Sequence, residues 1–433
     1  MEILLVIAYS SLFVFLIGKY NFFKIEGIPV QWIKVGLILK ILAGTGVGFV
    51  YTYYYTDRLT ADTFKFFDDS RILFNLIFTD PSTFFRLFTG IGSQTPEAII
   101  VSNQMTNWYD TFSPFNDNRT MIRLNTMLRF LSSGYYYVHV VFICFLSLAG
   151  MVAITKVISR EFPHLTKPIF LVFLLMPSVL FWGSGLLKDA LVFFSLGFTL
   201  YTFDKIIVDK KTNFEWVALF TFSLFLLMIT KFHSFLLILP ALPAWYLAAS
   251  GKLKGPKAFI VMGLIFLCLI YVIQLLIPEW DIPELLARKQ ASFIELGKNS
   301  GAASYIDIPV IKPDFFHILL MAPLGFITSL TRPFITDSGS AMMTLSAVEN
   351  TCILLLIIWT LFKAKWQLIS NKALPWLCLY FVVSSYMIIG LVTPILGAIV
   401  RYKAQALPFL IIFLLLLTFD RSKSSSGQMK NRQ

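Results

Sequence analysis

AFIVMGLIFLCLIYVIQLLI, residues 258–277, is a run of twenty residues without a single charged side chain. A helix needs about 20 apolar residues to cross the roughly 30 Å hydrocarbon layer of a bilayer, so this stretch alone predicts a membrane-spanning helix. The whole chain agrees with it, because 57% of the 433 residues are hydrophobic and only 14% are charged. The mean hydropathy is +0.75. Such a composition excludes a soluble domain and makes the lipid bilayer the first expected partner.

The same criterion applied along the chain predicts an all-α polytopic integral membrane protein with about eleven transmembrane helices. The predicted spans are residues 2–18, 35–55, 135–155, 168–186, 189–207, 215–231, 233–250, 258–277, 343–362, 374–394 and 405–420. We expect residues 1–420 to form a single transmembrane domain. The Ser-rich stretch 421–433 (RSKSSSGQMKNRQ) is expected to be a disordered cytoplasmic tail.

The distribution of basic residues predicts the orientation. Five connections assigned to one side each carry three Lys or Arg, counting Lys205 at the edge of its span with Lys210 and Lys211, and the tail carries four, whereas the short connections on the other side carry isolated ones. Cationic segments resist translocation, so the richly basic side is expected to be cytoplasmic. The N-terminus carries Glu2 where a cleavable signal has basic residues, and Lys19 and Lys24 follow the first apolar stretch. We therefore expect a multi-pass protein of a bacterial cytoplasmic (inner) membrane, with the N-terminus outside and the C-terminus cytoplasmic.

One apolar stretch does not fit as a crossing. If FHILLMAPLGFITSLT, residues 316–331, spanned the bilayer, the lysine-rich connection after residue 362 would lie outside. We expect a re-entrant or interfacial segment that helps to wall a site. It belongs to one of two predicted outer-face loops, 56–134 and 278–342. The first of these mixes charges with aromatics, which is typical of helices lying in the membrane interface.

Composition and spacing also argue against several classes of site. The net charge of +12 could favour nucleic acid, but 19 of the 36 Lys and Arg fall in the predicted cytoplasmic loops and tail, so we expect no nucleic-acid partner. The four cysteines lie in apolar runs without metal-ligand or disulfide spacing. They are Cys144, Cys268, Cys352 and Cys378. The four histidines are scattered, and no metal site is predicted from the residues.

Several charged residues are predicted to meet at the outer face, where solitary membrane charges are most often anchors that reach the headgroups. These are Lys188, Asp189, Lys231, His233, Arg332, Arg401 and Lys403. Lys188 and Asp189 could serve only as a polar cap of a tight turn, with Asp189 at a helix N-terminus. The functional alternative is that Lys188 binds a lipid-linked phosphate and Asp189 holds it in place.

Arginines extend this candidate phosphate site. Arg401 lies in an otherwise apolar stretch beside Tyr402, and its planar fork suits phosphate oxygens. Arg332 follows the segment 316–331. Lys231 and Lys403 are further candidate phosphate ligands, and Asp189, His233 and Tyr402 are expected to support them.

The acidic candidates lie in ADTFKFFDDS, residues 61–70. In a helix that begins near Asp62, Asp62 and Asp69 share one face but lie roughly 10 Å apart along the axis. They cannot share a proton at that distance, so one would act as the catalytic acid or base and the other would have a positioning role. The simpler interpretation is a salt-bridge ladder of Asp62, Lys65 and Asp69 on an interfacial helix.

An early span followed by a large outer loop with an acidic motif resembles the GT-C superfamily of membrane glycosyltransferases. Arg401-Tyr402-Lys403 with Pro408 is similar to an element near the last span of several such enzymes. ADTFKFFDDS, PSVLFWGSGLLKDAL, SLTRPF and IVRYKAQALPF together are similar to bacterial envelope polysaccharide-biosynthesis proteins. The resemblance implies that Asp62 acts as base or orients the acceptor and that Arg401 lies near the donor phosphate. The chain lacks a clear DxD motif, which leaves a divalent cation, Mg²⁺ or Mn²⁺, open.

The expected activity is sugar transfer from a polyprenyl-linked donor to a glycan or lipid-linked acceptor, for cell-envelope glycan synthesis. Asp62 would accept the acceptor's proton, and the cations would stabilise the leaving phosphate. Two alternatives remain open. One is an O-antigen or exopolysaccharide polymerase that joins lipid-linked repeat units, and the other is a transporter or flippase for an anionic lipid or solute.

Overall fold

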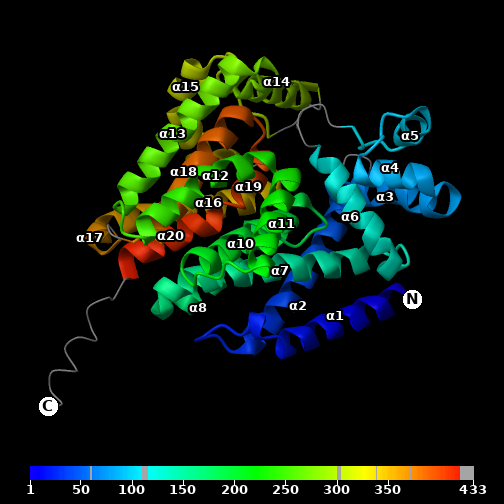
Figure 1. Ribbon diagram of the computed structural model, residues 1–433, viewed down its shortest axis with the longest axis horizontal. Coiled ribbons are helices and arrows are strands. Elements are labelled where there is room, and N and C mark those ends of the chain that lie inside the picture. Colours follow the sequence, from blue (N-terminus) through cyan, green and yellow to red (C-terminus); the bar gives the residue numbers. More distant parts are fainter. Residues whose placement is uncertain (59–60, 110–115, 300–303, 338, 370–371, 420–433) are drawn as a thin grey trace. The chain divides into compact units, whose positions relative to one another are not determined.

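The apolar runs of the sequence form helices, and the protein is all-α, with 81% of the described residues helical. The computed structural model describes residues 1–58, 61–109, 116–299, 304–337, 339–369 and 372–419. The tail 421–433, predicted to be disordered, lies outside the described residues. The described chain forms two units, shown as ribbons in Figure 1.

Unit 1 comprises Met1–Lys156, Leu180–Ile206 and Lys211–Phe235. Its helices are α1 (Glu2–Lys19), α2 (Val30–Phe49) with a π-helical turn η2 (Val50–Tyr54), α3 (Asp62–Thr79), α4 (Pro81–Thr89), α5 (Pro96–Ser102), α6 (Asp117–Ser132), most of α7 (Tyr136–Glu161), α10 (Lys188–Ile207) and α11 (Phe214–Thr230). A short 3-10 turn, η1 (Asn21–Phe23), follows α1.

Unit 2 comprises Val157–Val179, Ile207–Lys210 and the chain from Leu236 onward. Its elements are η3 (Pro163–Leu165), α8 (Thr166–Leu175), α13 (Gly255–Leu276), η4 (Pro278–Trp280), α14 (Ile282–Asn299), α15 (Phe315–Thr331), η5 (Ile335–Asp337), α16 (Ala341–Lys363), α17 (Trp366–Ile369), α18 (Leu374–Val392), α19 (Leu396–Lys403) and α20 (Leu407–Phe419). Helices α9 (Pro177–Trp182) and α12 (Phe232–Ala249) contribute residues to both units.

Eight of the eleven predicted spans coincide with described helices long and apolar enough to cross a bilayer, namely α1, α2, α7, α10, α12, α13, α16 and α18. A ninth span, predicted at 405–420, lies on the pair α19 and α20, which is bent by 58°. The count supported by the described helices is therefore eight or nine rather than about eleven. Whether 1–420 is one transmembrane domain stays a prediction.

The two remaining predicted spans fall on shorter helices. Residues 168–186 are divided, because α8 ends at Leu175 and Pro177 begins α9. A proline lacks the N–H that would continue the first helix and disfavours helical geometry in the residue before it. Residues 215–231 form α11, which is only 17 residues long and ends before Lys231. The span predicted at 168–186 is therefore broken into two helices. The 17 residues predicted at 215–231 match the length of α11, which is shorter than the about 20 residues that a crossing needs.

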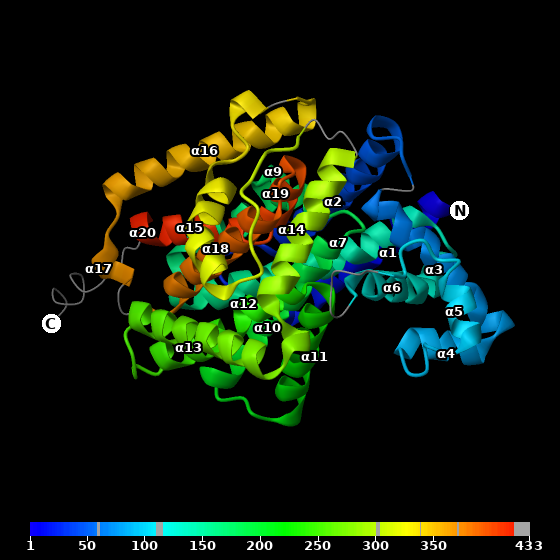
Figure 2. The ribbon, with the colours of Figure 1, turned by 90° about the horizontal axis from the view of Figure 1, so that it is seen from above.

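The segment predicted to be re-entrant or interfacial is a single helix, α15, of 17 residues. It begins with an N-cap in which Asp314 accepts a hydrogen bond from the N–H of His317 at 2.7 Å. Figure 2 shows α15 beside α18. A Cβ on Gly390 of α18 would meet the carbonyl oxygen of Gly325, so the two backbones approach closely through glycines. The position of α15 in a membrane stays a prediction.

The first predicted outer loop forms the short helices α3 to α6, which gather in one group of unit 1 (Figure 1). A buried cluster joins them around Phe66, Leu73, Leu87 and Trp108. Their boundaries follow local rules, since Asp80 caps α4 by accepting from the N–H of Thr83 at 3.1 Å. These helices are consistent with the amphipathic loop that the sequence predicted, and their place at a membrane interface remains a prediction.

Helices α7 and α10 are held together by a glycine contact. A Cβ on Gly150 would meet the backbone carbonyl of Phe193, and a Cβ on Gly197 would meet the carbonyl oxygen of Gly150. Small residues at such positions allow membrane helices to approach closely. The α7 span is also the most enclosed, with 83% of its most apolar window buried against 6% for α13. Helix α7 therefore lies in the core, and α13 leaves its apolar surface to the surroundings.

We expect Gly150→Ala to destabilise the protein by about 1–3 kcal/mol, because the added methyl group meets backbone rather than a mobile side chain. Gly46→Ala in α2 is the matched control, since a Cβ there has no neighbour within 4 Å. Alanine is the better helix former, so the control should be neutral or slightly stabilising. Thermal unfolding of both variants in detergent checks this, and equal melting temperatures would show that the contact is looser than described.

Candidate functional site

The start of α3 places the main acidic candidate. Helix α3 begins at Asp62, as the sequence predicted, and Lys65 pairs with Asp62 at 2.5 Å one turn later. Both side chains are about three-quarters buried, with exposures of 26% for Asp62 and 22% for Lys65. The ion pair places the Lys65 ammonium directly beside the Asp62 carboxyl group at the first turn of α3.

Asp69 has a different environment. Its carboxylate accepts from the backbone N–H of Thr106 and from both the backbone and the side-chain amide of Asn107, at 2.8–3.2 Å. Burial raises the pKa of the Asp69 carboxyl, and these hydrogen bonds oppose that rise. Of the proposed ladder, the described contacts contain only the Asp62–Lys65 pair. Asp69 anchors the segment after α5 to α3.

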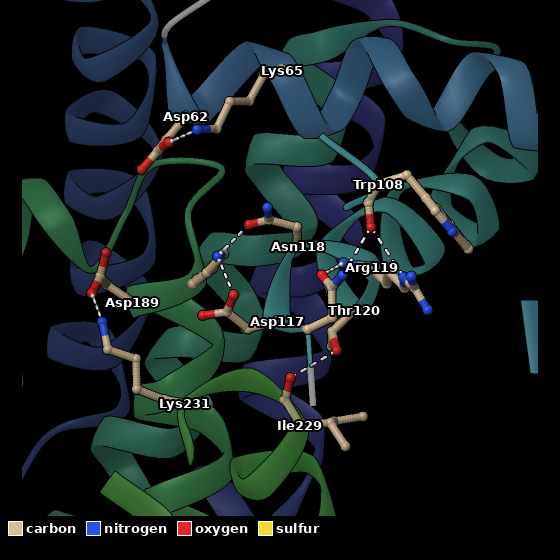
Figure 3. Close-up of polar contacts among 12 residues, drawn as sticks. Asp62, Lys65, Trp108, Asp117, Asn118, Arg119, Thr120, Asp189, Ile229 and Lys231 are labelled. Atoms are coloured by element: carbon tan, nitrogen blue, oxygen red, sulfur yellow. Dashed lines mark hydrogen bonds and ion pairs between the residues drawn. The ribbon is translucent and has the colours of Figure 1, made fainter. Parts of the chain in front are cut away.

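Lys188 lies at the first residue of α10 and contacts the start of α6. Its Nζ donates to Oδ1 of Asp117 and to Oδ1 of Asn118, each at 2.6 Å (Figure 3). The side chains of Lys188 and Asp117 are 13% and 21% exposed. An ammonium has three donors, and the described residues accept from two of them. The third N–H is available for a ligand.

Phe66 connects the two pairs. The Nζ of Lys65 lies 5.3 Å from the centre of the Phe66 ring, and the Nζ of Lys188 lies 5.0 Å from it. Both ammonium groups therefore lie beside one buried aromatic ring, which attracts cations through its π face. We call Asp62, Lys65, Phe66, Asp117, Asn118 and Lys188 the Lys188 cluster.

A second ion pair follows directly in the chain. Asp189 is fully buried in the first turn of α10, and Lys231 lies 3.6 Å from it at the end of α11 (Figure 3). The carboxylate lies at the positive end of α10, and the lysine follows the negative end of α11. Each charge therefore interacts favourably with the dipole of its helix. Asp189 pairs with Lys231, and the prediction that Asp189 holds Lys188 stays a prediction. His233 lies half-buried in the first turn of α12.

The position of α6 depends on buried polar contacts. Arg129 donates to Oγ of Ser70 at 2.8 Å and to the carbonyl of Phe67 at 2.6 Å, which joins α6 to α3. Burial lowers the pKa of Arg129 to about 10, so it stays protonated at neutral pH. His139 of α7 bonds to Asn125 and Ser132 at 2.7 and 2.6 Å. These contacts fix the helix that carries Asp117 and Asn118.

In unit 2, Lys403 contacts the backbone of Arg332, and the prediction that both residues bind phosphate stays a prediction. Nζ of Lys403 donates to the backbone carbonyl of Arg332 at 2.7 Å and to Oδ1 of Asn350 at 2.8 Å. Arg332 forms an ion pair with Asp337, and its guanidinium lies 4.7 Å from the centre of the Phe334 ring. Lys403 is 4% exposed, so its first role is to hold the end of α15 against α16.

The other two candidates of unit 2, Arg401 and Tyr402, lie with Lys403 on the short helix α19. Arg401 and Tyr402 are both half-buried, and the Tyr402 ring makes an edge contact with Phe293 at 6.1 Å between centres. Asp62, Lys188 and Lys231 belong to unit 1, whereas Arg332, Arg401 and Lys403 belong to unit 2. The prediction that both groups line one pocket stays a prediction.

Sequence reasoning missed Asp117 and Asn118, which accept hydrogen bonds from Lys188. It also missed the contact in unit 2 between Glu349 and the backbone N–H of Ser178. Glu349 had a signal, because an acid inside the predicted span 343–362 is a candidate functional residue by default. Asp117 and Asn118 had none, since their place in the predicted outer loop 56–134 gives no periodicity that identifies a distant lysine. Among the described residues, no three His, Cys, Asp or Glu side chains come together in a way that could hold a metal ion.

The helices and their apolar composition define a polytopic all-helical membrane protein with eight or nine candidate spans. Comparisons with protein-family models, with curated proteins and with solved structures give no match to this chain.

Proposed function

We propose that this protein is a membrane glycosyltransferase that takes a sugar from a polyprenyl-phosphate donor at the outer face of a bacterial cytoplasmic membrane. The observation that supports this most is the Lys188 cluster, in which a carboxylate and a cation with an unused donor lie near one buried aromatic ring. A base for an acceptor hydroxyl and a cation for a leaving phosphate are the two groups that such a transfer needs.

The proposed step begins when Asp62 accepts the proton of the acceptor hydroxyl. The acceptor oxygen forms a bond to the anomeric carbon, and the bond between that carbon and the phosphate oxygen breaks. The bonding electrons leave with the phosphate, where negative charge develops. Lys188 donates its third N–H to that phosphate.

The test is an assay of sugar transfer by the purified protein in liposomes that contain a polyprenyl-phosphate-linked sugar. Formation of a covalent glycosidic product that requires the protein supports the transferase. If the acceptor used is itself lipid-linked, and Arg332→Ala leaves single repeat units accumulating, the activity is that of a polymerase. Absence of product with every donor and acceptor offered removes the proposal.

We expect Lys188→Met to raise KM for the lipid-linked donor about tenfold or more and to lower kcat, because a charged hydrogen bond to the developing phosphate is lost. Methionine keeps the apolar stem over Phe66. Lys19→Met, an exposed lysine at the end of α1, is the control. Steady-state kinetics with varied donor check this. Identical constants for Lys188→Met and the wild type would exclude Lys188 as a phosphate ligand.

Buried charges inside candidate spans favour transport as a second candidate. Lys40 of α2 is fully buried and donates to the carbonyl of Gly183 at 2.8 Å and to Ser184 at 3.2 Å. Ionisable groups at such positions often mark ion or substrate pathways. Counterflow of a labelled anionic substrate in liposomes, without any covalent product, would identify a transporter.

A further inference from the structure

Three interrupted helices of unit 2 meet at one polar hollow. Ser178 follows the break between α8 and α9, Pro333 follows the end of α15, and Lys403 lies where α19 and α20 bend by 58°. The hollow has a volume of about 240 Å³ with its opening included. It is lined by Ser178, Pro333, Ser346, Glu349, Asn350, Ile353, Val400, Lys403 and Leu407. Irregular backbone among apolar helices is tolerated where it lines a cavity, and ligand sites often form there.

Opposite charges face this hollow from two sides. Glu349 accepts from the backbone N–H of Ser178 at 3.2 Å and from the Ser178 hydroxyl. Lys403 donates to Asn350 and to the carbonyl of Arg332. Within the described part of unit 2, no ion pair within 4.0 Å joins Lys403 to Glu349. A buried cation, Lys403, and a half-buried carboxylate, Glu349, that stop short of contact leave room for a polar group between them.

The unused hydrogen-bond donors and acceptors of Lys403 and Glu349 indicate what kind of group fits between them. An ammonium has three donors, and two of those on Lys403 have acceptors in the described chain. A carboxylate has about four acceptor positions, and Ser178 occupies two on Glu349. One donor and further acceptors therefore remain at the walls of the same hollow. A group that fits must accept from the ammonium and donate to the carboxylate.

We propose that the hollow is a binding site for a hydroxyl group, either a water molecule or an alcohol hydroxyl of a carbohydrate, that bridges Lys403 and Glu349. A hydroxyl is the smallest neutral group that accepts and donates at once. Much of the 240 Å³ is open space at the mouth, so the enclosed part takes a water or a single hydroxyl group rather than a whole lipid-linked headgroup. Isolated anions are opposed by Glu349, and isolated cations are opposed by Lys403. The site does not depend on the transferase activity proposed above.

A double-mutant cycle tests the bridge. Glu349→Gln and Lys403→Met should each lower the melting temperature, because each leaves one charge, the buried Lys403 or the half-buried Glu349, without its bridged counterpart. The double variant should lose less than the two single losses together. Thr351→Val is the control, since the Thr351 hydroxyl bonds within α16 to the carbonyl of Ala347 and lies outside the hollow's lining. Additive losses in the double variant would overturn the proposal.

The source of the hydroxyl is tested on the intact protein with glucose, galactose, mannose and N-acetylglucosamine as probes. A carbohydrate ligand should raise the melting temperature of the wild type and leave that of Glu349→Gln unchanged. A water should leave both unchanged and appear as a single density peak within hydrogen-bond distance of both side chains in an experimental structure. If no sugar changes the melting temperature of the wild type and the experimental structure shows no density in the hollow, the proposal is overturned. This outcome needs only the wild-type protein, so it holds even if a variant fails to fold.

Discussion

Replacing Asp62 with asparagine is expected to lower the rate of sugar transfer by about 10²–10⁴-fold, with little change in KM for the donor. The amide has nearly the shape of the carboxylate but cannot accept the acceptor's proton as the new bond forms. The Lys65 ammonium would lose its ion-pair partner in the same variant. Single-turnover measurement of product formed from a polyprenyl-phosphate sugar separates a slower chemical step from weaker binding.

Asp68→Asn provides the matched control for Asp62→Asn. Asp68 lies on the same helix and forms an exposed pair with Arg58, in which both side chains are about half exposed. Pairs of this kind contribute about 0–1 kcal/mol, so the control should fold and turn over like the wild type. Equal losses in both variants would assign the effect to the structure of α3. Full activity in a folded Asp62→Asn protein would remove Asp62 as the base.

Breaking the buried pair of Asp189 and Lys231 is expected to have the largest effect on stability. Asp189→Asn should reduce the free energy of unfolding by about 3–5 kcal/mol, because Lys231 would remain charged and 8% exposed without its counter-ion. The 3.6 Å separation favours the lower end of that range. Denaturant unfolding of unit 1 helices in detergent, followed by circular dichroism, measures the loss.

Two further variants show whether the loss of stability in Asp189→Asn comes from the broken ion pair. The double variant Asp189→Asn, Lys231→Met should recover much of the stability, because it removes both buried charges. Arg58→Gln, which breaks the exposed pair with Asp68, should cost about 1 kcal/mol or less. A double variant no more stable than Asp189→Asn would show that Asp189 acts through its place at the start of α10 instead.

Eight spans could be predicted because each is a property of one local window. The start of α3 at Asp62 and the pair with Lys65 were also predictable, since both follow from helical spacing. The span predicted at 168–186 was wrong in length, because the break at Pro177 was not weighed against the hydropathy of the window. Lys403 donates to the backbone carbonyl of Arg332 and to the side-chain amide oxygen of Asn350. These partners lie far away in the sequence, so no local pattern indicates them.

The sequence by itself determined that this protein is helical and belongs in a bilayer, because crossing the hydrocarbon layer depends on about 20 consecutive residues and needs no distant partner. Only the tertiary structure decided which charges meet. Lys188 and Asp117 are 71 positions apart, and Ser178 and Glu349 are 171 apart. A buried charge takes whichever partner the packing brings within reach, and packing among similar apolar helices is not encoded in any one window.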